Sequence, residues 1–372
     1  MRIFCDIIGQ KPMLWVFLLG ILVTLIVLIR RSLPRGKVAR DRVDAPGKFV
    51  RLSRGNVHYL DVRPGQSLHE AGQAEDADDV DDRILVLVHG ITTSSTAFWP
   101  HLGDQLTKVG KRRVIALDLY GRGWSESDDT MCMNEDFFAD QLAEFLRTVI
   151  PEKQFALLGW SMGGAVCARF CHRYAAAADA EFASLLNNVI FMSPAGLPTG
   201  KPFAAKLVHV PVLSDLLASF VAPALMIRNA KRDFLRLGFG NDMLAQVEHN
   251  VREYFGKNPG MSRSLLSTCC VLLAFRVSLC SLYPVSYICS LRHFRLDDLE
   301  HCFAALAPLE FAQRTRVHVV WGTNDTTCPF RNCETLQRLI PHADVRVVEN
   351  CGHSPHSQRP AETAAHVLSF LE

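Results

Sequence analysis

The chain has 372 residues, of which 49% are hydrophobic and 21% are charged, so it can bury a sizeable core, and a largely disordered chain is excluded. Forty basic residues against 38 acidic ones leave a formal net charge of +2, too small for a dedicated nucleic-acid binder, and no nucleic-acid partner is expected. The twelve cysteines show neither a regular disulfide framework nor paired CxxC spacing, which favours free thiols in a reducing compartment.

An uncharged apolar run spans residues 13–29, after an N-terminal tail at 1–12. Its length is close to the minimum that crosses roughly 30 Å of hydrocarbon as a helix, and we predict a transmembrane helix. A cleaved signal peptide is the main alternative, but the run continues into Arg30 and Arg31 rather than into small residues. A buried core helix is disfavoured by the same flanking charges.

The basic residues around this run predict its orientation. Two of them precede the run and six follow it: Arg2 and Lys11, then Arg30, Arg31, Arg35, Lys37, Arg40 and Arg42. Because cytoplasmic flanks carry the excess of Lys and Arg, we expect a single-pass protein whose catalytic part faces the cytosol. The sequence does not indicate which membrane holds it.

Residues 30–47 form a basic tether with Pro and Gly, and an antiparallel hairpin is predicted from the alternating segments 49–52 and 57–62. Residues 66–82 are polar and acidic. We interpret them as a solvated surface loop, because the glycine-turned spacing of a calcium loop is missing from this segment.

Short apolar runs then alternate with amphipathic segments. The apolar runs are Ile84–Val88, Val114–Leu117, Phe155–Leu158, Val189–Met192, Val317–Trp321 and Val345–Val348. Such runs are typical of strands that are buried on both faces of a parallel sheet. The predicted helices are Thr96–Val109, Asn134–Val149, Met162–Tyr174, Asn332–Ile340 and Ala361–Leu371. This alternation predicts an open α/β fold whose chemistry gathers at the carboxyl ends of the strands.

The sequence Gly159-Trp160-Ser161-Met162-Gly163 follows one of these apolar runs and precedes a helical pattern. This is the spacing of a nucleophile elbow, in which a strained strand-to-helix turn lifts a serine hydroxyl above the sheet. The small residues Gly159 and Gly163 avoid collisions at this sharp turn. The helix start also presents N–H groups that favour negative charge. We therefore predict Ser161 as a nucleophile.

A serine nucleophile needs a base that takes its proton and an acid that orients the base. The expected chain order is Ser, then Asp or Glu, then His. Asp325 and His353 follow the last two predicted strands, so we assign them as acid and base. His356, three residues further on, is the nearest alternative residue for the role of base. Asp118 is the competitor for the acid, but its loop favours a structural role in which the carboxylate anchors backbone amides.

An oxyanion hole needs two backbone N–H donors, one directly after the nucleophile and one from the loop after an earlier strand. Met162 is the first donor by position, and we predict Ile91 as the second because the run 84–88 leads into His89-Gly90-Ile91. For His89 we favour a bracing role in this loop over direct catalysis.

Together these motifs make the chain resemble the α/β-hydrolase superfamily, in particular its capped serine esterases and lipases, including membrane-anchored members similar to monoacylglycerol lipases. The motifs are His89-Gly90, the Asp118–Ser125 loop, GWSMGG at 159–164, WGTND at 321–325 and CGHSPH at 351–356. The resemblance implies a mostly parallel eight-stranded sheet flanked by helices, with core parts at 48–194 and 314–372. It also implies a helical cap at 195–313, before the last two strands.

Within this expected cap, residues 269–290 are unusually apolar and hold four cysteines, Arg276 and Pro284. Joining 264–268 directly to 291–294 would give an amphipathic helix, so we interpret 269–290 as an insertion or a translated non-coding stretch. A membrane-dipping lid hairpin is an alternative. Arg276 and Pro284 disfavour a second transmembrane span.

These observations predict a hydrolase that cleaves carboxylic esters through an acyl-enzyme on Ser161, with no metal or organic cofactor. The expected partners are a small ester, lipid-like because the cap sequence is apolar, and the membrane through residues 13–29. Two alternatives stay open: cleavage of thioester or C–C bonds on the same three residues, and a non-catalytic ligand-binding protein with this fold.

Overall fold

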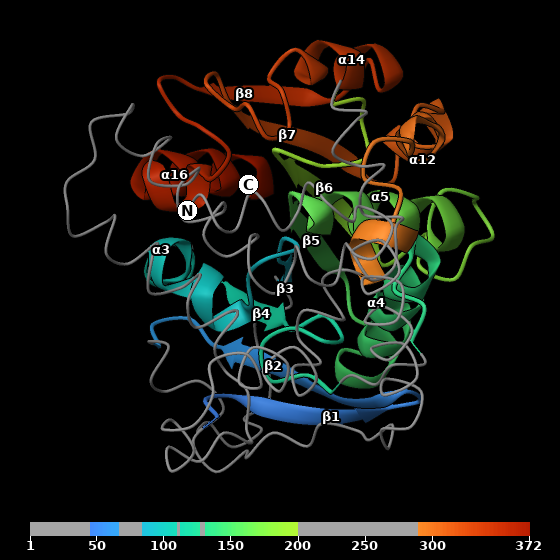
Figure 1. Ribbon diagram of the computed structural model, residues 1–372, viewed down its shortest axis with the longest axis vertical. Coiled ribbons are helices and arrows are strands. Elements are labelled where there is room, and N and C mark those ends of the chain that lie inside the picture. The colour runs from blue at the N-terminus through green and yellow to red at the C-terminus, as the bar shows by residue number, and fades with distance from the viewer. Residues whose placement is uncertain (1–44, 67–83, 110–111, 127–130, 200–288) are drawn as a thin grey trace, which may run out of the picture.

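The computed structural model describes residues 45–66, 84–109, 112–126, 131–199 and 289–372, and these build one eight-stranded sheet (Figure 1). The strands lie in the order β1-β2-β4-β3-β5-β6-β7-β8. They are β1 (Lys48–Leu52), β2 (Gly55–Val62), β3 (Ile84–Val88), β4 (Arg113–Leu117), β5 (Phe155–Trp160), β6 (Leu186–Met192), β7 (Arg316–Gly322) and β8 (Asp344–Val348). Only the pairs β1–β2 and β2–β4 are antiparallel, so the expected mostly parallel sheet is confirmed.

Every residue of β3, β4 and β5 is buried, which explains why these strands are apolar without alternation: helices cover both of their faces. The helices are α3 (Ser95–Lys108), α4 (Glu135–Val149), α5 (Met162–Tyr174), α12 (Glu300–Ala304), α13 (Leu309–Ala312), α14 (Asn332–Leu339), α15 (Pro355–Gln358) and α16 (Pro360–Leu371). The helices α3 and α16 pack together on one face, and α4 and α5 on the other (Figure 1).

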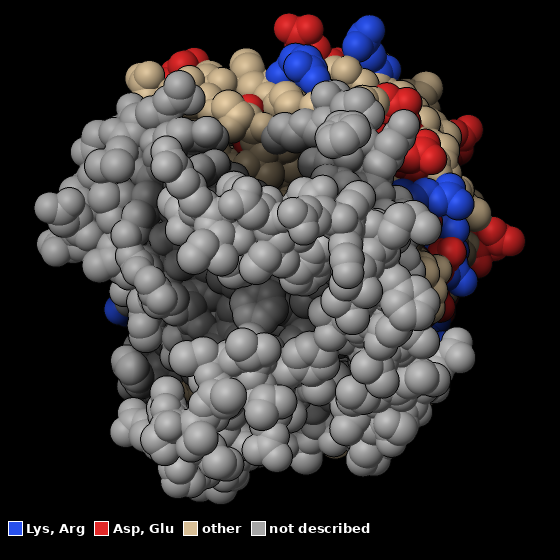
Figure 2. Space-filling view, viewed as in Figure 1, with Lys and Arg blue, Asp and Glu red and all other residues tan. Residues whose placement is uncertain are grey.

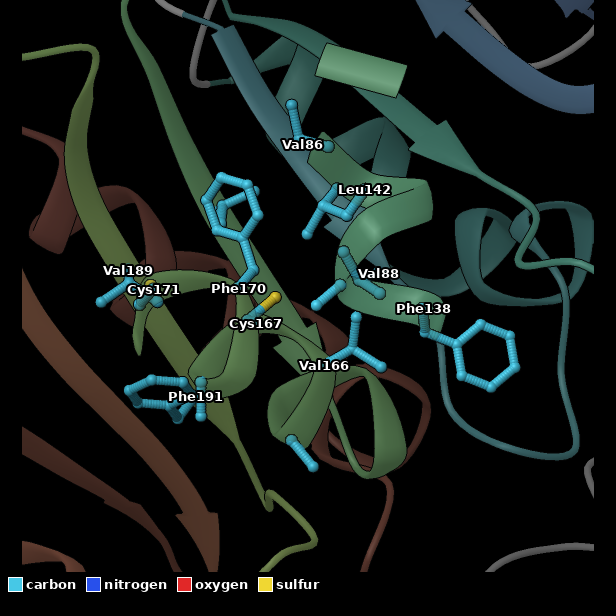
Figure 3. Packing of buried hydrophobic residues seen from close by; sticks show 14 of the residues in the cluster. Val86, Val88, Phe138, Leu142, Val166, Cys167, Phe170, Cys171, Val189 and Phe191 are labelled. Atoms are coloured by element: carbon cyan, nitrogen blue, oxygen red, sulfur yellow. The ribbon is translucent and has the colours of Figure 1, made fainter. Parts of the chain in front are cut away.

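The larger core lies between the sheet and the helices α4 and α5. Figure 3 shows Cys167 and Phe170 of α5 among Leu142 of α4, Val88 of β3 and Val189 of β6. All five side chains are buried. This packing fixes the direction of α5, and therefore the position of Ser161, which directly precedes its first turn.

Local sequence signals explain where α4 begins. The Asn134 side chain accepts a hydrogen bond of 2.8 Å from the Phe137 N–H, which satisfies one of the amides that a helix start leaves without an intrahelical partner. Glu135 and Asp136 follow in the first turn, where negative charge suits the helix dipole.

Within the described residues, the predicted strands and helices are present, with ends that differ by three residues or fewer. The predicted burial of 345–348 is wrong: this run is the edge strand β8, in which only Val348 is buried. The short helices α12, α13 and α15 were not predicted, because four or five residues carry little periodicity. Within the described residues, none of the helices is long and apolar enough to cross a membrane. Several predicted segments lie outside the described residues: the tail 1–12, the apolar run 13–29, most of the tether, residues 67–82 of the acidic segment, and 200–288 of the expected cap.

On the described part of the face in Figure 2, basic and acidic side chains are interspersed along the upper and right-hand edges. Charges of both signs therefore alternate over the region of α14 and α12, as is usual for a solvated surface. None of the eight cysteines that the structure describes forms a disulfide.

Candidate active site

Ser161 lies in the turn between β5 and α5 with φ 56° and ψ −122°, a backbone conformation that is strained for a residue with a side chain. Its N–H donates to Met192 O at 3.1 Å, and its carbonyl accepts from Ala195 N at 2.9 Å. A β-carbon on Gly163 would collide with Val88 O, and one on Gly159 would collide with the Gly163 backbone. The turn therefore requires glycine at both positions, as the nucleophile-elbow pattern predicts.

The structure brings Ser161, His353 and Asp325 together from three separate loops. His353 Nε2 lies 2.9 Å from Ser161 Oγ, and His353 Nδ1 lies 2.8 Å from Asp325 Oδ2. Because a carboxylate only accepts, Nδ1 carries the proton, and Nε2 is left to accept from the serine hydroxyl. The Asp325 side chain is fully buried, whereas that of His353 keeps 18% exposure.

The carboxylate of Asp325 is held in place by its own loop. Its Oδ1 accepts from Thr327 N at 2.8 Å and from Cys328 N at 3.0 Å, which leaves Oδ2 for the histidine. Trp321, which is fully buried on β7, donates from Nε1 to Cys328 O at 3.1 Å and fixes the same turn. Backbone N–H groups therefore fix the position of the Asp325 carboxylate, which in turn orients the His353 ring.

The loop that carries His353 is also fixed on both sides. Trp160, directly before the nucleophile, donates from Nε1 to His353 O at 2.7 Å. Gly352 N donates to the Gln358 side chain at 2.6 Å, and Asn324 N donates to Cys351 O at 2.8 Å. These bonds tie the loop to the strand end below Ser161, to α15 and to the Asp325 loop.

The two competitors for these roles lie elsewhere. His356 is buried with its ring edge-on to Trp160, 4.3 Å between centroids, and His353 rather than His356 lies between Ser161 and Asp325. Asp118 accepts from Ser95 N at 2.6 Å and from Trp124 N at 2.8 Å. Its predicted role as an anchor for backbone amides is thus confirmed.

Asp118 also pairs with a second buried side chain, since its Oδ2 lies 2.8 Å from His58 Nδ1. Burial alone would raise the pKa of Asp118, but the His58 partner and the Ser95 amide lower this pKa to about 2. The carboxylate is therefore ionised at neutral pH and holds together the loop after β4 and the start of α3.

His89 braces the loop after β3, as predicted. Its Nδ1 donates to Gly90 O at 2.7 Å, and its Nε2 accepts from Leu119 N at 3.0 Å, which is the pattern of a neutral imidazole. Complete burial lowers the pKa of His89 to about 4, despite the nearby Asp118 charge. A neutral His89 fixes the backbone that continues into Ile91.

The chain segments that carry the two predicted oxyanion donors both lie beside Ser161. Met162 begins α5, so its N–H is one of the amides without an intrahelical acceptor. The loop of Ile91 approaches from β3, and a β-carbon on Gly90 would lie 3.2 Å from Ser161 Cβ and 3.1 Å from the Trp160 ring. Glycine at position 90 thus allows this backbone to lie against the nucleophile.

Arg122 belongs to this arrangement, a role that was not predicted from the sequence. The guanidinium is fully buried and donates to Ile91 O at 3.4 Å, to Tyr120 O at 3.2 Å and to Ser290 Oγ at 2.7 Å. Its position in the Asp118–Ser125 loop was the available signal. The partner Ser290 lies 168 residues away and could not be inferred from spacing.

An eight-stranded, mostly parallel sheet with Ser, Asp and His converging at its carboxyl edge defines a protein of the α/β-hydrolase fold. The model of the alpha/beta hydrolase family matches residues 85–366, and the chain belongs to this family. The resemblance expected from the motifs is therefore confirmed.

Three similar proteins illustrate the range of the family. The 2-hydroxymuconate semialdehyde hydrolase of Pseudomonas sp. strain CF600 is 24% identical over 291 residues, 77% of this chain and 86% of that protein. The monoacylglycerol lipase ABHD6 of Rattus norvegicus is 38% identical over 53 residues, 14% of this chain and 16% of the lipase. An esterase structure from Exiguobacterium antarcticum has a TM-score of 0.61 at 16% identity, covering 87% of this chain and 99% of the esterase.

Proposed function

We propose that this protein is a serine hydrolase that cleaves carboxylic esters through an acyl-enzyme on Ser161. The observation that carries the proposal is the continuous hydrogen-bonded chain from Ser161 Oγ through the His353 ring to Asp325, at 2.9 and 2.8 Å. A non-catalytic binding protein would not need a strained serine, a correctly oriented imidazole and a buried carboxylate together.

In the proposed mechanism, His353 Nε2 takes the hydroxyl proton of Ser161 as Oγ attacks the ester carbonyl. Asp325 stabilises the imidazolium that forms. The N–H groups of Ile91 and Met162 bind the oxyanion of the tetrahedral intermediate. His353 then protonates the leaving alcohol, and water, activated by the same base, releases the acid and restores Ser161.

For the substrate we propose lipid-like esters of the monoacylglycerol type. The support is the apolar composition of 207–226 in the expected cap and the apolar run 13–29, which would hold the protein at a membrane. The similarity of a short segment to the rat monoacylglycerol lipase agrees with this proposal. We further propose a single-pass anchor with the catalytic part in the cytosol, on the basis of the basic flank after residue 29.

The direct test is labelling of the full-length protein in detergent or membranes by a fluorophosphonate, which reacts with activated serines. We expect labelling of the wild-type protein and none of Ser161→Ala, with equal thermal unfolding of both. Hydrolysis of monoacylglycerols, short-chain esters and acyl-CoA thioesters then identifies the substrate class. Absence of labelling in well-folded wild-type protein would contradict catalysis.

A second candidate is hydrolysis of a C–C bond in a diketone-like substrate by the same three residues. It is favoured by the similarity, over most of both chains, to the 2-hydroxymuconate semialdehyde hydrolase. A ring-cleavage diketone added to the same substrate panel separates the two functions. Faster turnover of that compound than of any ester would replace the ester proposal and keep Ser161 as nucleophile.

A further inference from the structure

A second group of reactive side chains lies at the far end of α5 from Ser161. His172, near the C-terminus of α5, faces His301 and Cys302 of α12, and within the described residues these three form the only His/Cys/Asp/Glu group whose ligand atoms converge as a metal site requires. The Cys302 Sγ lies 3.3 Å from His301 Nε2 and 3.6 Å from His172 Nδ1. All three ligand atoms lie within 4.8 Å of one another.

These distances fit a tetrahedral zinc-type ion. Zinc lies about 2.3 Å from sulfur and about 2.0–2.1 Å from imidazole nitrogen, so a sulfur and a nitrogen ligand in a tetrahedron are about 3.5–3.6 Å apart. The Cys302–His172 distance of 3.6 Å matches this separation, and the Cys302–His301 distance of 3.3 Å is slightly shorter. Two imidazoles and one thiolate are also the ligand types that zinc and similar borderline ions prefer over magnesium or calcium.

Arg169 occupies two of these ligand atoms and competes with a metal for them. Its Nη1 lies 3.0 Å from His172 Nδ1 and 3.8 Å from Cys302 Sγ. A guanidinium only donates, so His172 Nδ1 is the acceptor and points its lone pair into the cluster.

Arg169 has another partner that can hold it when a metal enters. Its Nε and Nη2 both lie 2.8 Å from Asp136 Oδ1 on α4, and Arg173 binds the same carboxylate at 2.9 Å. His301 is exposed, which gives an ion access from solvent, while the Cys302 side chain is buried behind it. An ion can therefore enter the cluster from solvent and meet three protein ligand atoms there.

We propose that His172, His301 and Cys302 form a binding site for a divalent zinc-class ion that joins α5 to α12. On binding, the S–H bond of Cys302 breaks, its proton goes to solvent, and a metal–sulfur bond forms. The two imidazoles supply lone pairs, and water takes the fourth position. One thiol proton is therefore released for each ion bound.

This site is separate from the proposed ester chemistry. His172 and Ser161 lie at opposite ends of α5, about 16 Å apart at about 1.5 Å per helical residue. The site instead connects the helix that follows the nucleophile to the segment by which the chain returns from the expected cap. Its occupancy would stabilise that return segment against the core.

The test is titration of the metal-free, full-length protein with Co²⁺ and Zn²⁺. We expect one ion per chain, a thiolate-to-cobalt charge-transfer absorption, release of one proton and a Tm that rises with metal concentration. Cys302→Ser should remove the absorption band. His172→Ala and His301→Ala should weaken binding at least tenfold. Arg169→Gln should tighten it several-fold, because the competing cation is removed.

Matched controls are the exposed thiol variant Cys132→Ser and the histidine variant His342→Ala, which should bind the ions like the wild-type protein. Circular dichroism melting of every metal-free variant checks folding. Unchanged cobalt absorption in Cys302→Ser, or binding lost equally in the controls, would overturn the proposal. The result does not depend on Ser161, because Ser161→Ala should bind the ions normally even if the hydrolase proposal fails.

Discussion

The indole Nε1 of Trp160 donates a hydrogen bond of 2.7 Å to the backbone oxygen of His353. One residue before the nucleophile thus fixes the loop that carries the proposed base, 193 positions later in the chain. The same indole lies edge-on to His356. The distance between Ser161 and His353 therefore depends on a side chain that takes no part in proton transfer.

Trp160→Phe removes this donor and keeps an aromatic ring. We expect kcat for ester hydrolysis to fall about 10–100-fold, because small displacements of a catalytic group are costly. The free energy of unfolding should fall by only about 1 kcal/mol from the lost hydrogen bond. Steady-state kinetics and urea denaturation measure the two effects, and an unchanged kcat would show that the His353 loop is fixed by its other bonds.

Replacing each histidine of the loop separately tests which one is the base. His353→Ala should reduce kcat by more than a thousandfold, since Ser161 then has no proton acceptor. His356→Ala removes a buried ring that packs on Trp160 and should mainly lower stability, with kcat within about tenfold of wild type. Equal loss of kcat in both variants, with both folded, would contradict the assignment.

Asp325→Asn preserves the shape of the buried side chain but removes its charge. The amide can donate to His353 Nδ1 and favour the wrong tautomer, so we expect kcat to fall about 10⁴-fold. The Thr327 and Cys328 amides can still bind the remaining oxygen, and the backbone of the loop should stay in place. A crystal structure of the variant, together with kcat, separates loss of charge from loss of structure.

Much of this site could be predicted from the sequence because its parts follow strand ends. Ser161, Asp325 and His353 each come shortly after a strand, and parallel strands bring their carboxyl ends to one edge of the sheet. The elbow glycines could also be predicted, because the sharp turn leaves no space for a β-carbon at positions 159 and 163.

The supporting contacts could not be predicted in this way. Trp160 with His353, and Arg122 with Ser290, join residues more than 160 positions apart through side chains whose direction depends on packing. The pairing of His58 with Asp118 was missed for the same reason, because a histidine on a hairpin strand carries no local sign of its partner. Sequence spacing therefore predicts the reacting groups better than the groups that position them.

Arg122 offers a test of such a positioning group. Arg122→Met removes the donors to Ile91 O and Ser290 Oγ while it retains an apolar side chain against Phe138. We expect kcat to fall at least tenfold with a smaller change in KM, because Ile91 belongs to the proposed oxyanion loop.

Ser290→Ala is the matched control for this variant, since it removes only the contact to the return segment and should reduce kcat less than Arg122→Met does. Arg122→Lys should not restore full activity, because an ammonium lacks the planar set of donors. If Arg122→Met lowered the Tm and left kcat unchanged, Arg122 would have a structural role alone.

The stability of the protein should depend on pH through buried histidines. Burial lowers the pKa of His89 to about 4, and burial followed by the charge of Arg316 lowers that of His318 to about 4. The unfolded chain takes up these protons below about pH 6.5, whereas the folded chain does so only near pH 4. Stability is therefore fully present above pH 6.5 and is lost as the pH falls toward 4.

For His89, which is completely buried, the loss is about 3 kcal/mol over this window. Urea denaturation at neutral pH and near pH 4.5 measures the loss. His318→Gln keeps a side chain that can donate to Asn188 Oδ1 and cannot titrate, so its stability should fall less steeply over the same window. A free energy of unfolding that is constant or rises on acidification would contradict the neutral, buried state of both rings.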